Sequence, residues 1–265
     1  MKRYGSLIRY GGLALLILFT SQFAGCIVSR GFIFNAKKKN RRPKLAGKLI
    51  YIKNDGRRVY GFFSRRGSKL MVMFHGNRVP MYKEEKFARR FVRQGYSVLL
   101  VEYAGYGYAR KYSPSESVVY RDSEAIIKYA QRRWRFSKKK TFAWGRSLGS
   151  GVATEMARRG LVSRMILVTP YTSIASVAEH KSVPLLPRLF IYDNFNTLCK
   201  AADLRLPVLL IHGRRDRLTP YSMSVSLKKE FPQAQLITLR RANHYNVFRH
   251  MGNRSWARVF RFLRD

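Results

Sequence analysis

One stretch decides the fold, Thr141-Phe142-Ala143-Trp144-Gly145-Arg146-Ser147-Leu148-Gly149. Its first four residues are largely apolar and predict a short buried strand. The segment Ser150–Arg159 contains Ala, Val, Met and Glu without proline, and predicts a helix. A serine between two glycines at a strand–turn–helix corner is typical of a nucleophile, because glycine permits a tight, strained turn. The pattern therefore predicts that Ser147 is a nucleophile held between Gly145 and Gly149.

A nucleophilic serine needs a histidine and an acid, and both follow in the chain. The apolar run 208–211 predicts a central parallel strand, and the loop after it contains Asp216. The run 234–239 predicts the next strand, and the loop after it contains His244. This order of serine, acid and histidine is that of hydrolases built on a parallel sheet. In such a triad the histidine takes the proton of Ser147 and the acid orients the imidazole.

Each member of this triad has a structural alternative. An Asx turn beside Gly and Pro is the alternative for Asp216. However, the loop after the predicted strand 165–168 contains no carboxylate, so the other common position of the acid is empty. Of the five histidines, only His244 follows a final strand. His75 and His212 precede glycines at strand ends, and a structural role is expected for them.

The negative charge of a tetrahedral intermediate requires hydrogen-bond donors, an oxyanion hole. The first expected donor is the backbone amide of Leu148, directly after the nucleophile. The predicted strand 69–74 leads into a loop that provides the second, expected from the amide of Asn77, with Arg78 as the alternative. An ordinary glycine turn is the structural alternative for this loop.

Strand and helix patterns alternate along residues 47–265. The runs 49–52 and 59–63 flank Asn54-Asp55-Gly56, which predicts a hairpin. The further strands are expected at 70–74, 97–101, 141–144, 165–168, 208–211 and 235–239, and helices at about 83–94, 117–133, 147–159, 222–230 and 254–263. The alternation predicts one α/β domain with a mostly parallel, doubly wound sheet of eight strands.

The segment 173–202 is short, mostly apolar and broken by Pro184 and Pro187. It is interpreted either as a helix pair packed on the core or as a small cap over an acyl-binding groove. The two interpretations stay open at this stage.

Several further motifs accompany the triad. They are His75-Gly76-Asn77, Glu102-Tyr103-Ala104-Gly105-Tyr106-Gly107, Ser113-Pro114-Ser115-Glu116, Asp122, Pro170-Tyr171-Thr172-Ser173 and Ile211–Asp216. With them, residues 47–265 resemble the α/β-hydrolase superfamily, and within it a small, minimally lidded subgroup with N-terminal membrane anchors that includes acyl-protein thioesterases. Glu102 and Ala104 replace the Asp and Arg of that subgroup, and the Asn that follows its histidine stands one place later, as Asn246. The resemblance implies an α/β-hydrolase fold with a short cap.

Residues 1–26 have the features of an export signal. Basic residues precede the apolar core 13–19, and small residues precede Cys26, as in bacterial lipoproteins whose cysteine becomes the lipidated first residue. The alternatives are an uncleaved single-pass anchor over about 11–28 and a plain cleaved signal. The basic run 37–42 predicts that residues 27–46 are a linker lying against anionic headgroups.

The net charge of +39 concerns partners and solubility more than the fold. No motif for a specific nucleic acid accompanies the basic residues, so an anionic membrane surface is the preferred partner. A general bias toward basic composition explains the charge equally well. Acylation of Cys26 would leave Cys199 as a lone thiol, expected to be buried. No metal or organic cofactor is implied, and nothing indicates the oligomeric state.

These observations predict a membrane-tethered serine hydrolase, an exported lipoprotein or a single-pass protein, that cleaves an acyl ester or thioester through an acyl-enzyme on Ser147. A lipid-like substrate is suggested by the tether, by the apolar segment 183–195 and by the family resemblance. A serine peptidase or amidase is the alternative enzyme, because the same triad attacks amides. An inactive hydrolase fold that acts as a scaffold is the alternative without catalysis.

Overall fold

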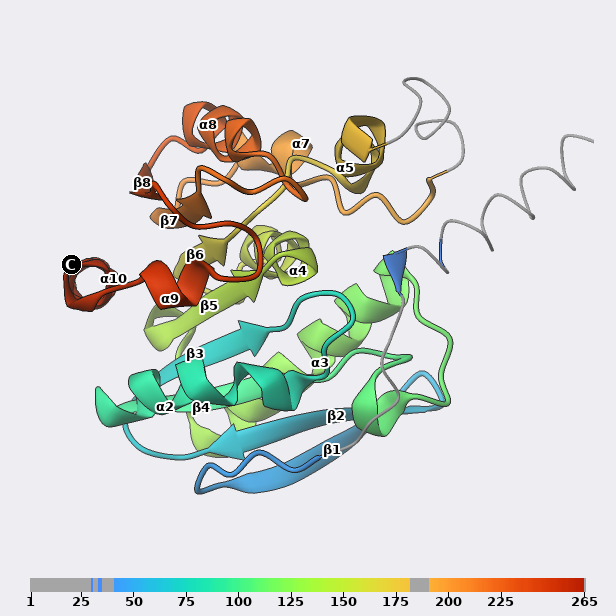
Figure 1. The fold of residues 1–265 in the computed structure, drawn as a ribbon. Coiled ribbons are helices and arrows are strands. Elements are labelled where there is room, and N and C mark those ends of the chain that lie inside the picture. The colour runs from blue at the N-terminus through green and yellow to red at the C-terminus, as the bar shows by residue number, and fades with distance from the viewer. Residues whose placement is uncertain (1–29, 31–32, 35–40, 182–190, 265) are drawn as a thin grey trace, which may run out of the picture.

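The computed structural model describes residues 30, 33–34, 41–181 and 191–264. Its centre is an eight-stranded sheet with the order β1-β2-β4-β3-β5-β6-β7-β8 (Figure 1). Strands β3 to β8 pair in parallel, whereas β1 and β2 are antiparallel to their neighbours. The predicted mostly parallel, doubly wound sheet is therefore confirmed.

The strand bounds agree with the apolar runs in the sequence. They are β1 (Lys48–Asn54), β2 (Arg57–Ser64), β3 (Lys69–Phe74), β4 (Tyr96–Val101), β5 (Thr141–Arg146), β6 (Arg164–Val168), β7 (Val208–Gly213) and β8 (Ala234–Leu239). Every residue of β4 and β7 is buried, because helices cover both faces of a parallel sheet. The hairpin is also confirmed. Its turn residues Asp55 and Gly56 have φ of 44° and 72°, which an Asp-Gly pair tolerates.

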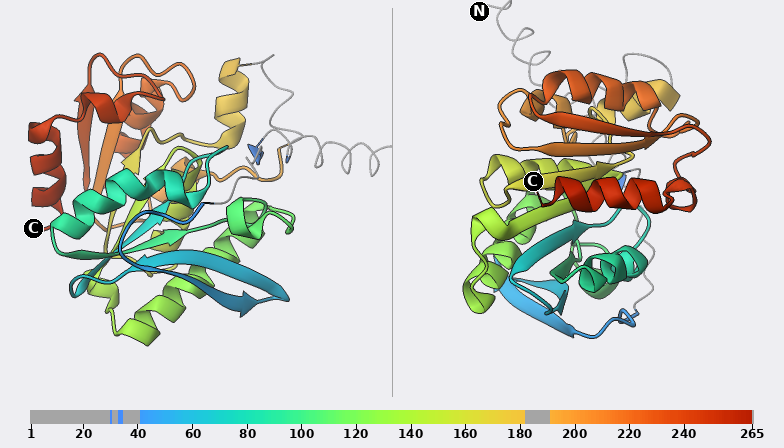
Figure 2. Two further views of the ribbon diagram at one scale, coloured as in Figure 1. Left: turned by 60° about the horizontal axis from the view of Figure 1, so that its bottom comes forward. Right: turned by 90° about the vertical axis from the view of Figure 1, so that its left-hand side faces the viewer.

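Helices lie between the successive strands from β3 to β8, and further helices follow β8. They are α2 (Glu85–Arg93), α3 (Glu116–Trp134), α4 (Leu148–Arg158), α5 (Ile174–Lys181), α7 (Thr197–Ala201), α8 (Tyr221–Glu230), α9 (Val247–His250) and α10 (Asn253–Phe262), with short 3-10 turns at Met81–Glu84, Gly107–Ala109 and Lys138–Lys140. One layer contains α3, α4 and α8, and the other contains α2 and α10 (Figure 2).

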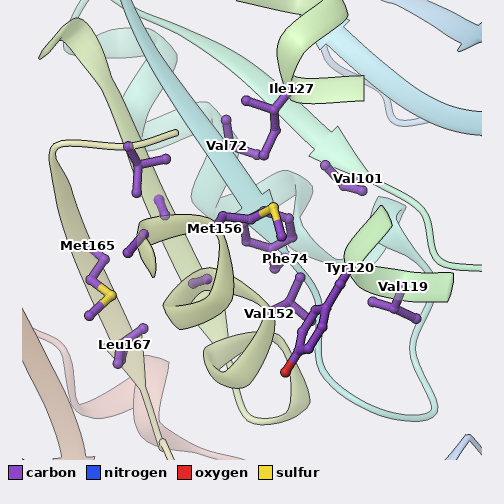
Figure 3. Close-up of a cluster of buried hydrophobic side chains, with 14 of the residues drawn as sticks. Val72, Phe74, Val101, Val119, Tyr120, Ile127, Val152, Met156, Met165 and Leu167 are labelled. Atoms are coloured by element: carbon purple, nitrogen blue, oxygen red, sulfur yellow. The ribbon is translucent and has the colours of Figure 1, made fainter. Parts of the chain in front are cut away.

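The core has two parts because side chains alternate along each strand. In β3, Val72 and Phe74 point toward α3 and α4, where they join Ile127, Val152 and Met156 (Figure 3). The intervening Met71 and Met73 belong to the second cluster, against α2 and α10. The sheet is thus fixed between two apolar layers, and its carboxyl edge is held in place for the loops that follow each strand.

The interval 27–46 differs from the predicted linker. Two of its described residues, Ile33 and Phe34, are only 3% and 7% exposed and belong to the first core cluster. Further along, the backbone amide of Lys44 donates to Glu85 at 2.7 Å. Burial of apolar surface draws this part of the chain onto the domain, and the basic run alone gave no indication of it.

Three other expectations concern the chain ends and the cap. Residues 1–26, with Cys26, lie outside the described residues, as do 182–190 of the predicted cap. No helix that the structure describes is both long and apolar enough to cross a membrane. The expectation that Cys199 is buried is wrong. This residue is exposed on the short helix α7, because the neighbours Thr197 and Ala201 occupy the buried face.

Candidate active site

Ser147 stands at the corner between β5 and α4 in a backbone conformation that L-residues rarely adopt. Its φ is 50° and its ψ is −119°. A Cβ atom on Gly149 would lie 2.3 Å from the carbonyl oxygen of Phe74, and one on Gly145 would lie 2.4 Å from that of Gly149. Only glycine fits at both positions, so the two glycines flanking the serine are explained by close backbone approach. This backbone conformation directs the side chain of Ser147 into the cavity at the carboxyl edge of the sheet.

The structure brings the three side chains of the expected triad together. Nε2 of His244 lies 3.1 Å from Oγ of Ser147, and Nδ1 of His244 lies 2.8 Å from Oδ2 of Asp216. The loops after β7 and β8 carry the acid and the histidine, as the strand order requires. This geometry fits an imidazole that donates from Nδ1 to the carboxylate and accepts the serine proton at Nε2.

The carboxylate of Asp216 is buried and has several hydrogen-bond donors. Its Oδ1 accepts from the amides of Leu218 and Thr219, both at 2.9 Å. Its Oδ2 accepts from the Thr219 hydroxyl at 3.1 Å. Burial alone would raise the pKa of the carboxyl, but the bonds from His212 and His244 and the charge on His244 outweigh it and hold this pKa well below its usual range. Asp216 is therefore ionised at neutral pH.

His212 has a closer relation to the site than its place at a strand end indicated. Its Nε2 lies 3.2 Å from Oδ2 of Asp216 and 2.8 Å from the carbonyl oxygen of Thr219. Its Nδ1 lies 2.6 Å from Oγ of Ser224 in α8. A structural role was expected for His212, and these contacts show that it supports Asp216, the acid of the expected triad. The four-residue spacing between His212 and Asp216 was the signal available in the sequence.

The two expected oxyanion donors, Asn77 and Leu148, line one cavity together with Ser147 and His244. Within the described residues, no hydrogen bond uses the amide of either donor residue. The Asn77 side chain instead accepts from the Arg78 amide at 2.7 Å and from the Tyr106 hydroxyl at 2.8 Å. Because the Arg78 amide is occupied, Asn77 is the better placed of the two alternatives.

Of two buried acids near the site, one holds the loop that carries Asn77 and the other holds the residue before Ser147. Glu102 accepts from the Met81 amide at 3.0 Å and lies 3.3 Å from Nε2 of His75. Glu84, fully buried, accepts from Nε of Arg146 at 2.8 Å, directly before the nucleophile. Glu102, which replaces the Asp of the subgroup, is thus held by Met81 and His75. Arg146, the residue between Gly145 and Ser147, is held by Glu84.

The cavity above Ser147 has a volume of about 290 Å³, at the lower end of small-molecule sites. Its apolar lining residues are Ile33, Val79, Leu148, Tyr171, Ile174, Val177 and Leu218. The charged lining residues are Arg78, Arg146 and Lys181, and none of the described lining residues is Asp or Glu. The helix α5 provides three of these side chains, which favours the cap interpretation of the segment that begins at Ser173.

The loop that carries His244 is internally braced. The side chain of Asn246 accepts from the Asn243 amide at 2.7 Å, and Asn243 accepts from the amides of Tyr245 and Asn246, both at 3.0 Å. The displaced asparagine thus still fixes the histidine loop. Tyr245 is 83% exposed at the edge of the cavity.

Sequence reasoning missed four contributors to the site. They are Thr219, Tyr106, Glu84 and Ile33. The apolar triplet Phe32-Ile33-Phe34, which precedes the basic run 37–42, was a signal for Ile33. The other three depend on loop conformations that no spacing rule gives.

The chain is similar to known proteins in sequence and in fold. A family model described as serine aminopeptidase S33 matches residues 66–195, and one described as TAP-like protein matches residues 196–265. An esterase from Pyrococcus furiosus has a similar structure, with a TM-score of 0.73 at 19% identity over 86% of this chain and 97% of that one. The chain belongs to the α/β-hydrolase superfamily.

Two curated relatives are also similar in sequence. A putative α/β hydrolase of Acanthamoeba polyphaga mimivirus is 27% identical over 57% of this chain and 56% of its own length. The α/β-hydrolase domain-containing protein 17C of Xenopus tropicalis is 28% identical over 63% of this chain and 53% of its own length. The matches span little more than half of each relative.

Proposed function

We propose that this protein is a serine hydrolase that cleaves acyl esters or thioesters through an acyl-enzyme on Ser147. The observation that carries the proposal is the position of His244, whose two ring nitrogens reach Ser147 and Asp216 at 3.1 Å and 2.8 Å. The cavity above them is lined mainly by apolar side chains, which suits an acyl group.

In the proposed reaction, Oγ of Ser147 attacks the carbonyl carbon while its proton passes to Nε2 of His244. The carbonyl oxygen becomes negative and accepts hydrogen bonds from the amides of Leu148 and Asn77. Collapse of the intermediate expels the alcohol or thiol, which takes the proton from His244. Water, deprotonated by His244, then attacks the acyl group, releases the carboxylic acid and restores the serine hydroxyl.

A peptidase is the second candidate, because one matching family model is described as serine aminopeptidase. An aminopeptidase needs a carboxylate to bind the ammonium group of its substrate. The described residues that line the cavity instead include Arg78, Arg146 and Lys181 and no acid. Arg146 is paired with Glu84, and the cations Arg78 and Lys181 favour ester or thioester substrates over peptides with a free amino terminus.

Labelling with a fluorophosphonate probe tests the catalytic proposal. We expect the intact protein to take one label, and the Ser147→Ala variant to take none. Ser222→Ala, at an exposed serine of α8, is the control and should label at the wild-type rate. Absence of label on the folded wild-type protein would contradict the proposal and favour an inactive scaffold. Turnover of p-nitrophenyl butyrate compared with aminoacyl p-nitroanilides separates esterase from peptidase.

We further propose that the enzyme works at a membrane, tethered through lipidated Cys26. Ile33 in the cavity wall stands seven positions after Cys26, a chain length of at most about 25 Å. The cavity edge also carries the exposed residues Tyr245, Arg78 and Lys181, and aromatic and cationic side chains favour anionic membrane surfaces.

Radioactive palmitate tests the tether. In a bacterial host, the wild-type protein should incorporate label and the Cys26→Ser variant should not. Unchanged mass and membrane fractionation of Cys26→Ser would contradict lipidation and favour the uncleaved anchor.

A further inference from the structure

Three described residues from before the sheet make a defined contact with the hydrolase domain. They are Arg30, Ile33 and Phe34, here called the N-terminal contact. The Phe34 amide donates to the Arg30 carbonyl oxygen at 2.8 Å, the spacing of one helical turn.

Two interactions hold the N-terminal contact in place. Nε of Arg30 lies 2.9 Å from Oδ2 of Asp193, a nearly buried carboxylate that also accepts from the amide of Glu116 at the start of α3. The ring of Phe34 packs edge-on against Phe195, with centroids 5.9 Å apart. The contact is therefore tied to a polar and an aromatic partner at once.

The aromatic partner connects this contact to the nucleophile helix. Phe195 is fully buried, and a Cβ atom on Gly151 in α4 would lie only 3.0 Å from the Cβ of Phe195. Helix α4 begins directly after Ser147. Phe34 thus packs on a side chain that touches the helix behind the nucleophile.

Ile33 reaches the reaction site itself. Its side chain is 3% exposed and lines the cavity that contains Ser147. Around it, the apolar part of the lining consists of Tyr171 and of Ile174 and Val177 from α5. Ile33 therefore belongs to the apolar side of the cavity, where the hydrocarbon part of a substrate would lie.

We propose that Ile33 is a specificity-determining residue that limits the length of the acyl group, and that Arg30 and Phe34 hold it in position. The inference rests on the proposed acyl hydrolysis. Ile33 forms part of the apolar wall of this cavity of about 290 Å³, so a change of its side chain alters which acyl chains fit. The N-terminal contact would then form part of the substrate site, in addition to any role of the N-terminal segment in tethering.

A purely structural role for Ile33 would act on stability alone. The ratio of kcat/KM for p-nitrophenyl octanoate to that for p-nitrophenyl butyrate distinguishes the two, because loss of folded protein cancels in a ratio. We expect Ile33→Ala to raise this ratio at least threefold. Ile33→Trp should lower it at least tenfold.

Ile50 provides the matched control, since it is a buried isoleucine of the same core cluster that does not line the cavity. Ile50→Ala should leave the ratio within twofold of wild type. Arg30→Glu places a carboxylate beside Asp193 and should raise the ratio as Ile33→Ala does, whereas Arg30→Lys should keep it. All variants are made in the full chain.

Fluorophosphonate labelling separates the two possible failures. A wild-type protein that takes no label overturns the catalytic proposal and this inference with it. Variants that are labelled at the wild-type rate but keep the wild-type octanoate-to-butyrate ratio overturn this inference alone. If Ile33→Trp does not fold, an unchanged ratio in Ile33→Ala and Arg30→Glu overturns it equally.

Discussion

His212 and His244 both contact Oδ2 of Asp216, at 3.2 Å and 2.8 Å. One carboxylate oxygen thus serves the proposed catalytic histidine and a second, fully buried histidine. The second histidine is anchored by Ser224 in α8, so it fixes the position of the acid relative to the helix layer. This relation makes His212 a positioning residue in the proposed mechanism.

The substitution His212→Ala removes that anchor and leaves Asp216 and Ser224 with one partner fewer. We expect a loss of about 2–3 kcal/mol in the free energy of unfolding, since the lost bond involves a charged group. We also expect kcat/KM for p-nitrophenyl butyrate to fall about tenfold, or about 1.4 kcal/mol. Urea unfolding and initial rates measure the two effects. His180→Ala, at an exposed position of α5, is the control, and equal behaviour of the two variants would contradict the positioning role.

The hydroxyl of Tyr106 fixes the oxyanion loop through Asn77. Tyr106→Phe removes only that hydroxyl, so the Asn77 amide should be less well aligned with the developing oxyanion. We expect kcat to fall about three- to tenfold with KM nearly unchanged, because the amide acts mainly in the transition state. Tyr108→Phe, at a neighbouring half-buried tyrosine, should leave both constants unchanged. A rise in KM alone would contradict this role.

The elbow depends on the absence of side chains at its glycines. Gly149→Ala would place a Cβ atom 2.3 Å from the carbonyl oxygen of Phe74 in β3. The backbone of β3 would have to move to relieve this clash. We expect destabilisation of about 3 kcal/mol and loss of fluorophosphonate labelling. Gly252→Ala has no atom within 4 Å of the added group, and its effect should stay below about 1 kcal/mol. Normal labelling of Gly149→Ala would contradict the observed corner.

The stability of the fold in acid depends on Glu155 in α4. Burial alone would raise the pKa of this carboxyl, but hydrogen bonds from Arg158, Arg159 and Lys200 outweigh burial and lower it to about 2. A pKa lower in the folded than in the unfolded chain stabilises the fold above about pH 4.5. That contribution is lost as pH falls toward 2.

Glu155→Gln should therefore cost about 2–3 kcal/mol at pH 7, and the difference from wild type should shrink between pH 4.5 and pH 2. Urea unfolding at several pH values measures it. Glu230→Gln, at an exposed position of α8, is the control and should change little. A difference that stays constant with pH would contradict the linkage.

Much of the fold follows from patterns that sequence displays directly. The apolar runs of β3, β5 and β7 and the Asp-Gly turn between β1 and β2 each have a local cause, and the parallel order follows from their alternation with helices. The positions of Ser147, Asp216 and His244 after successive strands were visible for the same reason. They converge because the carboxyl ends of parallel strands meet at one edge of the sheet.

The features of the site and fold that could not be predicted from the sequence depend on contacts between distant segments. Ile33 is buried because it packs into the wall of the cavity, although the run 37–42 that follows it is basic. Cys199 is exposed because a five-residue helix buries only one face. The contact of Tyr106 with Asn77 joins residues 29 positions apart through a single hydroxyl. The hydrophobic periodicity of a helix or strand carries no information about such long-range contacts.

The most direct test of the central claim is the mass of the enzyme during turnover. Mixing with p-nitrophenyl butyrate, rapid acid quenching and peptide mass analysis should show a butyryl group on the peptide that contains Ser147. A burst of p-nitrophenol up to one equivalent of enzyme should accompany it. Steady hydrolysis with no acyl adduct at Ser147, or undiminished hydrolysis by Ser147→Ala, would contradict the acyl-enzyme mechanism.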